Sequence, residues 1–120
     1  MAALNFRLIF APAILDGRKT QTIRAIRKDG RVPKRGDTLQ LYTGMRTRHC
    51  HKICDVICEY TREITITELG VKLDGQALYP SSIYWLAEAD GFDSVESFKN
   101  FFKDTYGLPF RGTLIKWKTS

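Results

Sequence analysis

The amino-acid sequence predicts an α+β fold: a small, strongly curved β-sheet or barrel of five or six strands, with two or three helices at one end. Two observations support this fold class. Up to about residue 75, most apolar residues alternate with polar ones, as on strands with one buried face, whereas from residue 80 they recur at helical spacing. A length of 120 residues is also typical of one domain, so we expect a single domain over residues 1–120.

The first part of the chain supplies most of the strands. Between the first two of them, a short helix is expected to begin at Pro12 and to end at Gly17. Asp74 and Gly75 form the dipeptide that is typical of a tight hairpin turn. The alternating segments predict strands at residues 5–10, 38–43, 50–60 and 63–69.

The last part of the chain is mainly helical. Apolar spacing predicts helices at residues 80–90 and 94–107. Asp93 and Glu96 are a plausible capping pair for the second helix, and Gly107 is expected to end it. Residues 112–118 then alternate again, which predicts a final strand that returns to the sheet.

Positive charge is concentrated in the first half of the chain. Residues 1–52 hold twelve Lys and Arg against three Asp and Glu, whereas residues 53–120 hold seven against ten. Because Lys and Arg gain affinity by displacing counterions from phosphates, this asymmetry favours a phosphate-bearing partner such as RNA or a nucleotide. A solvated basic surface without a dedicated ligand explains the charge equally well.

Three cysteines and two histidines lie within residues 49–58, a density that invites a zinc interpretation. On an extended strand, however, Cys50 and Cys54 would be about 13 Å apart, too far to share a metal or a disulfide. We therefore expect all three cysteines to be buried, unpaired members of a central strand, with no metal and no cofactor. His49 and His51 would lie on the opposite face and could contact a ligand.

No apolar stretch is long enough to span a membrane. The first residues do not resemble a signal peptide, because they include Arg7 and no cleavage pattern of small residues follows. We expect a cytoplasmic, monomeric protein with no membrane partner.

Residues 17–24 group a glycine with cationic and hydroxyl side chains in the order Gly-x-Lys-x-x-Thr-x-Arg. On a straight strand Thr22 and Arg24 would share one face, and Lys19 would lie on the other. All three can therefore meet one ligand only if Lys19 lies in a turn before the strand begins. Gly17 suits such a turn because glycine accepts a positive φ.

This octet resembles the ASCH domain family, together with "RGDTLQLYTGMR" at 35–46, "ADGFDSVESFKNFF" at 89–102 and the terminal "LIKW". The resemblance covers nearly the whole chain. It implies a PUA-like β-barrel with a cleft that is lined by Lys19, Thr22 and Arg24 and suits RNA or a nucleoside-like ligand.

Similar members of that family include small amidohydrolases that remove the acetyl group from N4-acetylcytidine. In these, the lysine and threonine of the motif act with a glutamate that precedes the second helix. Lys19 and Thr22 match directly, and the resemblance implies that they are catalytic. The acid departs from the pattern: Asp90 stands at its place, one methylene shorter, with Glu88 as a nearby substitute.

The chemical roles of Lys19, Thr22 and the acid can be assigned in two ways. A threonine hydroxyl is a useful nucleophile only when a base takes its proton, and a lysine can be that base only if its pKa is lowered, here by the neighbouring Arg18, Arg24 and Arg27. A protonated Lys19 would instead stabilise the oxyanion, which leaves the carboxylate as the base. The sequence supports both.

Three functions therefore remain open. The first is the amidohydrolase. The second is a non-catalytic RNA-binding module, with Tyr42 stacking on a base and Lys52 among the phosphate contacts. The third, which ranks last because both histidines lie in one strand, is a ribonuclease. The residues expected to bind the ligand are Gly17, Arg24, Tyr42, Arg46, Arg48 and His49.

Overall fold

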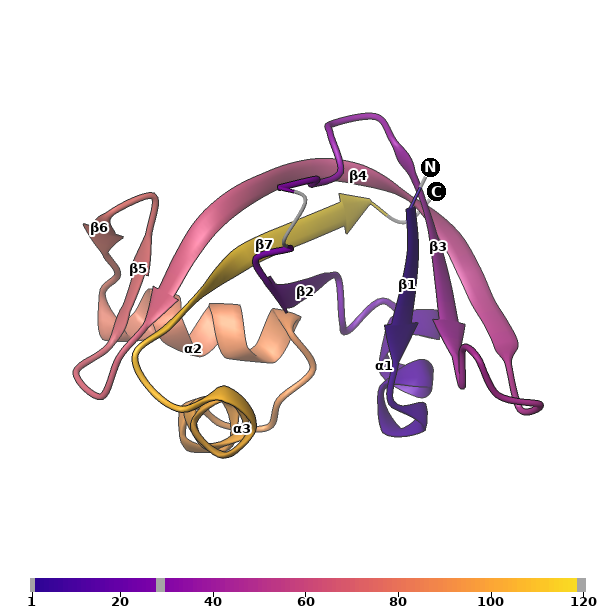
Figure 1. Ribbon diagram of the computed structural model, residues 1–120. Helices are drawn as coiled ribbons and strands as arrows, with labels where there is room; N and C mark the ends of the chain where they lie inside the picture. Colours follow the sequence, from indigo (N-terminus) through magenta and orange to yellow (C-terminus); the bar gives the residue numbers. More distant parts are fainter. Residues whose placement is uncertain (1, 28–29, 119–120) are drawn as a thin grey trace.

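The computed structural model describes residues 2–27 and 30–118 and confirms an α+β fold (Figure 1). The described strands number seven rather than five or six: β1 (Ala2–Phe6), β2 (Gln21–Ala25), β3 (Thr38–Thr43), β4 (His51–Ile66), β5 (Val71–Leu73), β6 (Gln76–Ala77) and β7 (Phe110–Lys118). The helical elements are η1 (Leu8–Phe10), α1 (Ala11–Leu15), α2 (Pro80–Ala89) and α3 (Val95–Tyr106).

The strands form one curved sheet in the order β1-β3-β4-β5-β6, and β7 pairs with both β4 and β2. Only the β1–β3 pair is parallel among the described strands. No described pairing joins β2 to β1, so the sheet is strongly curved but does not close into a complete barrel.

Strand β4 is the long arch of the molecule (Figure 1). We predicted two strands, at 50–60 and 63–69, but this segment is one continuous strand of 16 residues, because no turn-forming residue separates the two alternating runs. β4 pairs with β3 over its first half and with β7 over its second half, and register shifts after Leu41 and Cys58 increase its curvature.

The first strand lies earlier in the chain than predicted, at Ala2–Phe6 rather than at residues 5–10. It ends at Phe6 rather than at residue 10, and Arg7 leads into the 3-10 helix η1, where the Phe10 backbone N–H donates to the Arg7 carbonyl at 3.0 Å. Helix α1 follows directly. Pro12 favours this start because it lies in the first turn, where a backbone N–H would have no partner within the helix.

Helix α3 also differs from the prediction at its start. Ser94 is the N-cap, and its hydroxyl accepts a hydrogen bond from the Ser97 N–H at 3.0 Å, so the predicted pair of Asp93 and Glu96 is not the cap. The prediction for the other end is confirmed, since Gly107 terminates the helix at a φ of 82°. The Asp74–Gly75 turn is likewise confirmed, with φ values of 48° and 83° between β5 and β6.

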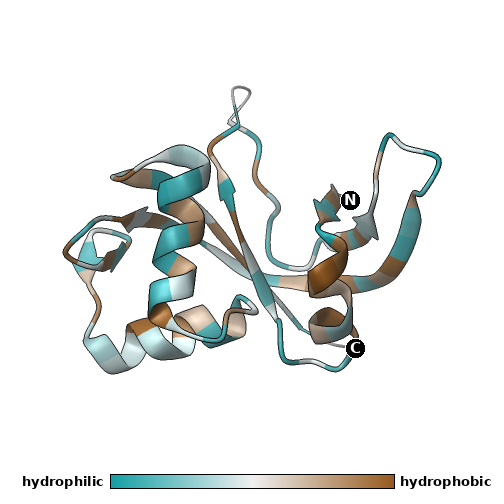
Figure 2. Cartoon of the chain, turned by 90° about the horizontal axis from the view of Figure 1, so that it is seen from below, coloured by the Kyte–Doolittle hydropathy of each residue, from teal (hydrophilic) through white to brown (hydrophobic). Residues whose placement is uncertain are grey.

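The buried hydrophobic residues form two clusters. Figure 2, a view from below, shows α2 and α3 on one side of the molecule and η1 and α1 on the other. The helix-side cluster consists of Ile23, Ile64, Ile66, Val71, Ile83, Leu86, Ala87, Phe98, Phe102, Phe110 and Leu114. The second cluster consists of Phe6, Ile14, Leu39, Leu41, Val56, Cys58, Ile115 and Trp117. Strands β4 and β7 contribute to both, and the buried polar residues of the site lie on and beside β2.

The prediction for the cysteines is partly wrong. All three are free, but only Cys58 is buried; Cys54 is half-buried, and Cys50 is exposed because it precedes β4. No group of three or more His, Cys, Asp or Glu in the described residues is arranged to hold a metal. None of the helices in residues 2–27 and 30–118 is long and apolar enough to cross a membrane.

Candidate functional site

The end of helix α2 determines where Asp90 lies. Gly91, at a φ of 93°, donates its N–H to the Glu88 carbonyl at 2.9 Å, and Phe92 donates its N–H to the Ala87 carbonyl at 3.0 Å. These two bonds are the Schellman motif that commonly ends a helix. The segment Asp90-Gly91-Phe92 therefore stops α2 and leaves Asp90 as its C-cap, with only 4% of the residue exposed.

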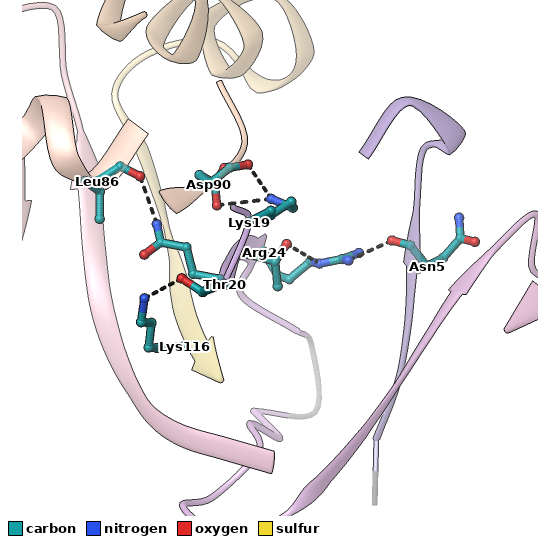
Figure 3. Close-up of polar contacts among 9 residues, drawn as sticks. Asn5, Lys19, Thr20, Arg24, Leu86, Asp90 and Lys116 are labelled. Atoms are coloured by element: carbon teal, nitrogen blue, oxygen red, sulfur yellow. Dashed lines mark hydrogen bonds and ion pairs between the residues drawn. The ribbon is translucent and has the colours of Figure 1, made fainter. Parts of the chain in front are cut away.

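The segment between α1 and β2 binds the carbonyl groups at this helix end. Thr20 donates its N–H to the Ala89 carbonyl at 2.9 Å, and Gln21 donates Nε2–H to the Leu86 carbonyl at 3.2 Å. Lys19 Nζ donates to the Asp90 carbonyl (Figure 3). Helix C-termini have unpaired carbonyls and a partial negative charge, so a lysine is favoured here.

Lys19 is buried in the turn before β2, as the octet required. Gly17 adopts a φ of 83°, the Lys19 N–H donates to the Ala13 carbonyl at 2.9 Å, and Lys19 is 2% exposed. Its ammonium lies 4.7 Å from the ring centre of Phe10 and 5.7 Å from that of Phe6. The cation is thus held between aromatic faces and a carboxylate.

Lys19 and Asp90 form a buried ion pair, with Nζ 3.5 Å from Oδ1. Burial raises the pKa of Asp90 to about 6, although the nearby Lys19, Gln21 and Arg24 side chains oppose the shift. Burial also lowers the pKa of Lys19, and Asp90 opposes that shift. Arg24, which we expected to lower the pKa of Lys19, contributes less than burial. Among the described residues, no donor makes a hydrogen bond to Asp90 Oδ1, so this buried oxygen can accept one from a ligand.

Thr22 and Arg24 share one face of β2, as alternation predicted. Arg24 Nε donates to Thr22 Oγ1 at 3.1 Å, Nη2 donates to the Asn5 carbonyl at 2.7 Å, and the guanidinium lies 4.7 Å from the ring centre of Phe6 (Figure 3). We expected Arg24 to clamp a ligand. These contacts with Thr22 and with Asn5 and Phe6 of β1 fix its guanidinium beside the Thr22 hydroxyl, and its ligand-binding role stays a prediction.

These side chains line one cavity of about 230 Å³ between the two hydrophobic clusters. Its polar lining consists of Lys19, Thr22, Arg24 and Asp90, together with Asn5, Arg7 and Thr105. Its walls are mainly aromatic, formed by Phe6, Phe10, Phe92, Phe101, Phe102 and Tyr106. A small site with aromatic walls and several polar groups suits a flat ring that carries a polar substituent.

The structure does not bring every predicted residue to this cavity. Arg46, Arg48 and His49 are exposed in the loop between β3 and β4, Tyr42 is half-buried on β3, and none of the four lines the cavity. The loop is attached beside it, because the Met45 N–H donates to Asn5 Oδ1 at 3.0 Å. Gly17 shapes the preceding turn and also lies outside the lining.

The two candidate acids are clearly separated. Asp90 pairs with Lys19, whereas Glu88 is exposed and lines a separate hollow with Arg18 and Tyr84.

Some residues of the site were not predicted from the sequence. Gln21 is 3% exposed and binds the end of α2, and Phe10, Phe92, Phe101 and Tyr106 form cavity walls. The sequence held one signal for Gln21. On a strand it must point to the face opposite to that of Thr20 and Thr22, which indicates a polar contact on that face. The aromatic residues come from three separate segments, and only the folded chain brings them together.

Comparisons with known proteins show the fold. No protein-family model matches the chain, and no curated protein matches it in sequence. The crystal structure of ASCH from Zymomonas mobilis superimposes with a TM-score of 0.62 at 14% identity, covering 98% of this chain and 66% of that chain. Two mutants of the same protein, one serine-to-alanine and one tyrosine-to-phenylalanine, give TM-scores of 0.61 and 0.59, also at 14% identity, with 98% of this chain and 66% and 68% of those chains covered. The chain has the ASCH fold and spans about two thirds of the length of these structures.

Proposed function

We propose that this ASCH-fold protein is an amidohydrolase that removes the N4-acyl group of an acetylated cytidine. The observation that carries the proposal is the buried pair of Lys19 and Asp90, which shares a cavity with a threonine hydroxyl held by Arg24. A base, a cation and a hydroxyl in one cavity are the groups that acyl transfer needs.

The cavity walls support a pyrimidine as the ligand. Phe6 and Phe10 cover the Lys19 side of the cavity, and Phe92 and Phe101 come from the α2–α3 connection and from α3. A pyrimidine ring can stack on such faces. Its acylated N4 amide would then lie beside the polar groups, with its N–H available to Asp90 Oδ1, which accepts no hydrogen bond from the described residues although Lys19 Nζ lies 3.5 Å away.

The contacts support Asp90 as the base and Lys19 as the electrostatic partner. The carboxylate, the α2 carbonyls and the aromatic faces all favour the ammonium form of Lys19. Because the pKa of Asp90 is about 6, the carboxylate is ionised at neutral pH, and its conjugate acid is strong enough to return the proton.

The reaction then runs as follows. Asp90 accepts the proton of Thr22, or of a water beside it, as that oxygen attacks the acyl carbon, and Lys19 stabilises the oxyanion. The C–N4 bond breaks, and the proton passes from Asp90 to N4, which releases cytidine. Where Thr22 is the nucleophile, a water activated by Asp90 hydrolyses the acyl-threonine to acetate and the free hydroxyl.

Arg24 has a distinct part in this scheme. Its Nε–H donates to the Thr22 oxygen, so the hydroxyl proton must point to another acceptor, and negative charge that develops on that oxygen is stabilised.

A second candidate function, an RNA-binding module, is favoured by the separate cationic loop. Arg46 and Arg48 are exposed beside the cavity mouth, and the first half of the chain carries most of the positive charge. A ribonuclease has less support, since neither His49 nor His51 lines the cavity.

The proposal is tested by incubating the purified protein with N4-acetylcytidine and, separately, with short single-stranded RNA, and by following cytidine release and strand scission by chromatography. We expect cytidine release without scission, and loss of release in Thr22→Val, which keeps the shape but removes the hydroxyl. Thr20→Val is the matched control, because Thr20 binds Lys116 outside the cavity lining. Salt-sensitive RNA binding without cytidine release would favour the binding module instead.

A further inference from the structure

Gln21 is a buried polar residue that lies behind the cavity rather than in its lining. It is 3% exposed and begins β2, and alternation points its side chain to the face opposite to that of Thr22. Burying an amide is unfavourable unless its groups find hydrogen-bond partners, so an apolar side chain would suit this position if packing were its only role. The role of Gln21 therefore follows from the contacts of its amide.

The amide of Gln21 binds the last turn of α2 beside Asp90. Its Nε2–H donates to the Leu86 carbonyl at 3.2 Å, and the same carbonyl accepts the backbone N–H of Asp90 at 3.1 Å. A carbonyl oxygen has two lone pairs, so it can accept both bonds. This shared acceptor holds Gln21 of β2 next to Asp90 at the end of the helix.

The same amide also acts on the Asp90 carboxyl group. A glutamine amide has two N–H groups, of which the Leu86 carbonyl uses one. Burial raises the pKa of Asp90 to about 6, Lys19 opposes this rise most strongly, and hydrogen bonding by the Gln21 side chain opposes it as well. Gln21 thus favours the ionised carboxylate without adding a charge to the site.

The other groups around Asp90 that could titrate or carry charge come from three elements. They line the cavity with it and are Lys19 before β2, Arg24 on β2, Arg7 after β1 and Tyr106 on α3. Of these, Lys19 and Arg24 lower the pKa of Asp90. A change at Gln21 leaves all of them in place, so its effect on Asp90 can be measured separately.

We propose that Gln21 is the positioning residue of the base: its amide ties the end of α2 to β2 and keeps the Asp90 carboxyl group ready to accept a proton in the cavity. This inference rests on the proposed function for the role of Asp90 as the base. Gln21 acts only through Asp90, because it does not line the cavity where the ligand would bind. Substrate binding should therefore be independent of Gln21, whereas proton transfer should depend on it.

Substitution of Gln21 by methionine tests this role, since methionine has a similar length and no amide. Losing a hydrogen bond to a carboxylate should raise the midpoint of Asp90 ionisation by about one pH unit above its value of about 6. A carbon-13 NMR titration of the Asp90 carboxyl group measures this midpoint in the absence of substrate.

The rate of N4-acetylcytidine deacetylation gives the second readout. In Gln21→Met, kcat/KM at pH 6 should fall about fivefold, because the ionised fraction of Asp90 falls from about one half to about one tenth. The rate should recover at pH 8, where the carboxyl group is ionised in both proteins. The loss should appear in kcat and not in KM, since Gln21 does not line the cavity. A merely structural defect would not be repaired by raising the pH.

Gln40→Met is the matched control, because Gln40 lies on β3 and outside the cavity lining, and it should keep the wild-type midpoint and rate. Gln21→Asn keeps an amide on a shorter side chain; it should also raise the midpoint, and it replaces Gln21→Met if that variant does not fold. An unchanged midpoint in the folded Gln21 variant, an equal shift in Gln40→Met, or a loss of rate that persists at pH 8 would overturn the proposal. A raised midpoint in a chain without deacetylase activity would contradict the proposed function alone, and deacetylation with an unchanged midpoint would contradict this inference alone.

Discussion

Replacing Lys19 by methionine should destabilise the protein in a strongly pH-dependent manner. Methionine fits between the Phe6 and Phe10 faces, but it leaves Asp90 without its buried counter-charge. Removing one partner of a buried pair typically costs about 3–5 kcal/mol, because the other charge remains uncompensated. We expect a loss of this size at pH 8.

The pH dependence follows from the pKa of Asp90. In the wild-type chain this pKa is raised from 3.8 to about 6, so the folded state binds the proton more tightly than the unfolded state, and stability falls as the pH rises through that window. Lys19 is the largest influence that lowers this pKa. Without it the pKa of Asp90 rises further, so stability continues to fall at higher pH. Each further unit of pKa adds about 1.4 kcal/mol to the loss. At pH 5, where Asp90 is neutral in both proteins, the loss should be only about 1 kcal/mol, the usual contribution of a single hydrogen bond.

Urea unfolding of the wild type and of Lys19→Met at pH 5 and pH 8 measures both values. The double variant Lys19→Met with Asp90→Asn should lose the pH-dependent part, because no carboxylate remains to titrate. The reasoning is refuted if Lys19→Met loses the same free energy at both pH values, or if the double variant keeps the difference between them.

Three further predictions concern reactivity, catalysis and RNA binding. In the native protein, Cys50 should react rapidly with a thiol reagent and Cys58, whose pKa is raised by burial, only on unfolding; equal rates would contradict the described burial. The kcat/KM for N4-acetylcytidine should rise with pH up to about 6, where Asp90 ionises, and then level off; a flat profile between pH 5 and 7 would exclude this carboxylate as the base. Arg48→Glu should weaken single-stranded RNA binding and flatten its salt dependence, whereas Lys103→Glu on α3 should not; equal effects would remove the cationic loop from the RNA surface.

The geometry of the octet was predictable because alternation on a strand is a strict rule. Thr22 and Arg24 had to share a face, and Lys19 could join them only from a turn, which Gly17 allowed. The structure contains this turn. The position of Asp90 was predictable in outline, since a glycine after a helix is a common stop signal, but its pairing with Lys19 joins residues 71 positions apart and depends on tertiary structure.

Other features could not be read from local patterns. The continuous strand β4 and the early end of β1 depend on pairing partners and on a 3-10 turn, and neither leaves a strong local signal. Charge clustering suggested that Arg46 and Arg48 belong to the same groove as the octet, yet the β3–β4 hairpin places them outside the cavity. Arg27, expected to lower the pKa of Lys19, lies outside the lining of that cavity.

The most direct test of the proposed catalytic centre is the rate of N4-acetylcytidine deacetylation by Asp90→Asn, compared with Glu88→Gln as the matched change on the exposed neighbour. Circular dichroism would verify that both variants are folded. We predict that Asp90→Asn lowers kcat by at least about 100-fold, the usual contribution of a general base, while Glu88→Gln keeps the wild-type rate. Wild-type turnover in Asp90→Asn, or a loss confined to Glu88→Gln, would contradict the assignment of the buried pair as the catalytic centre.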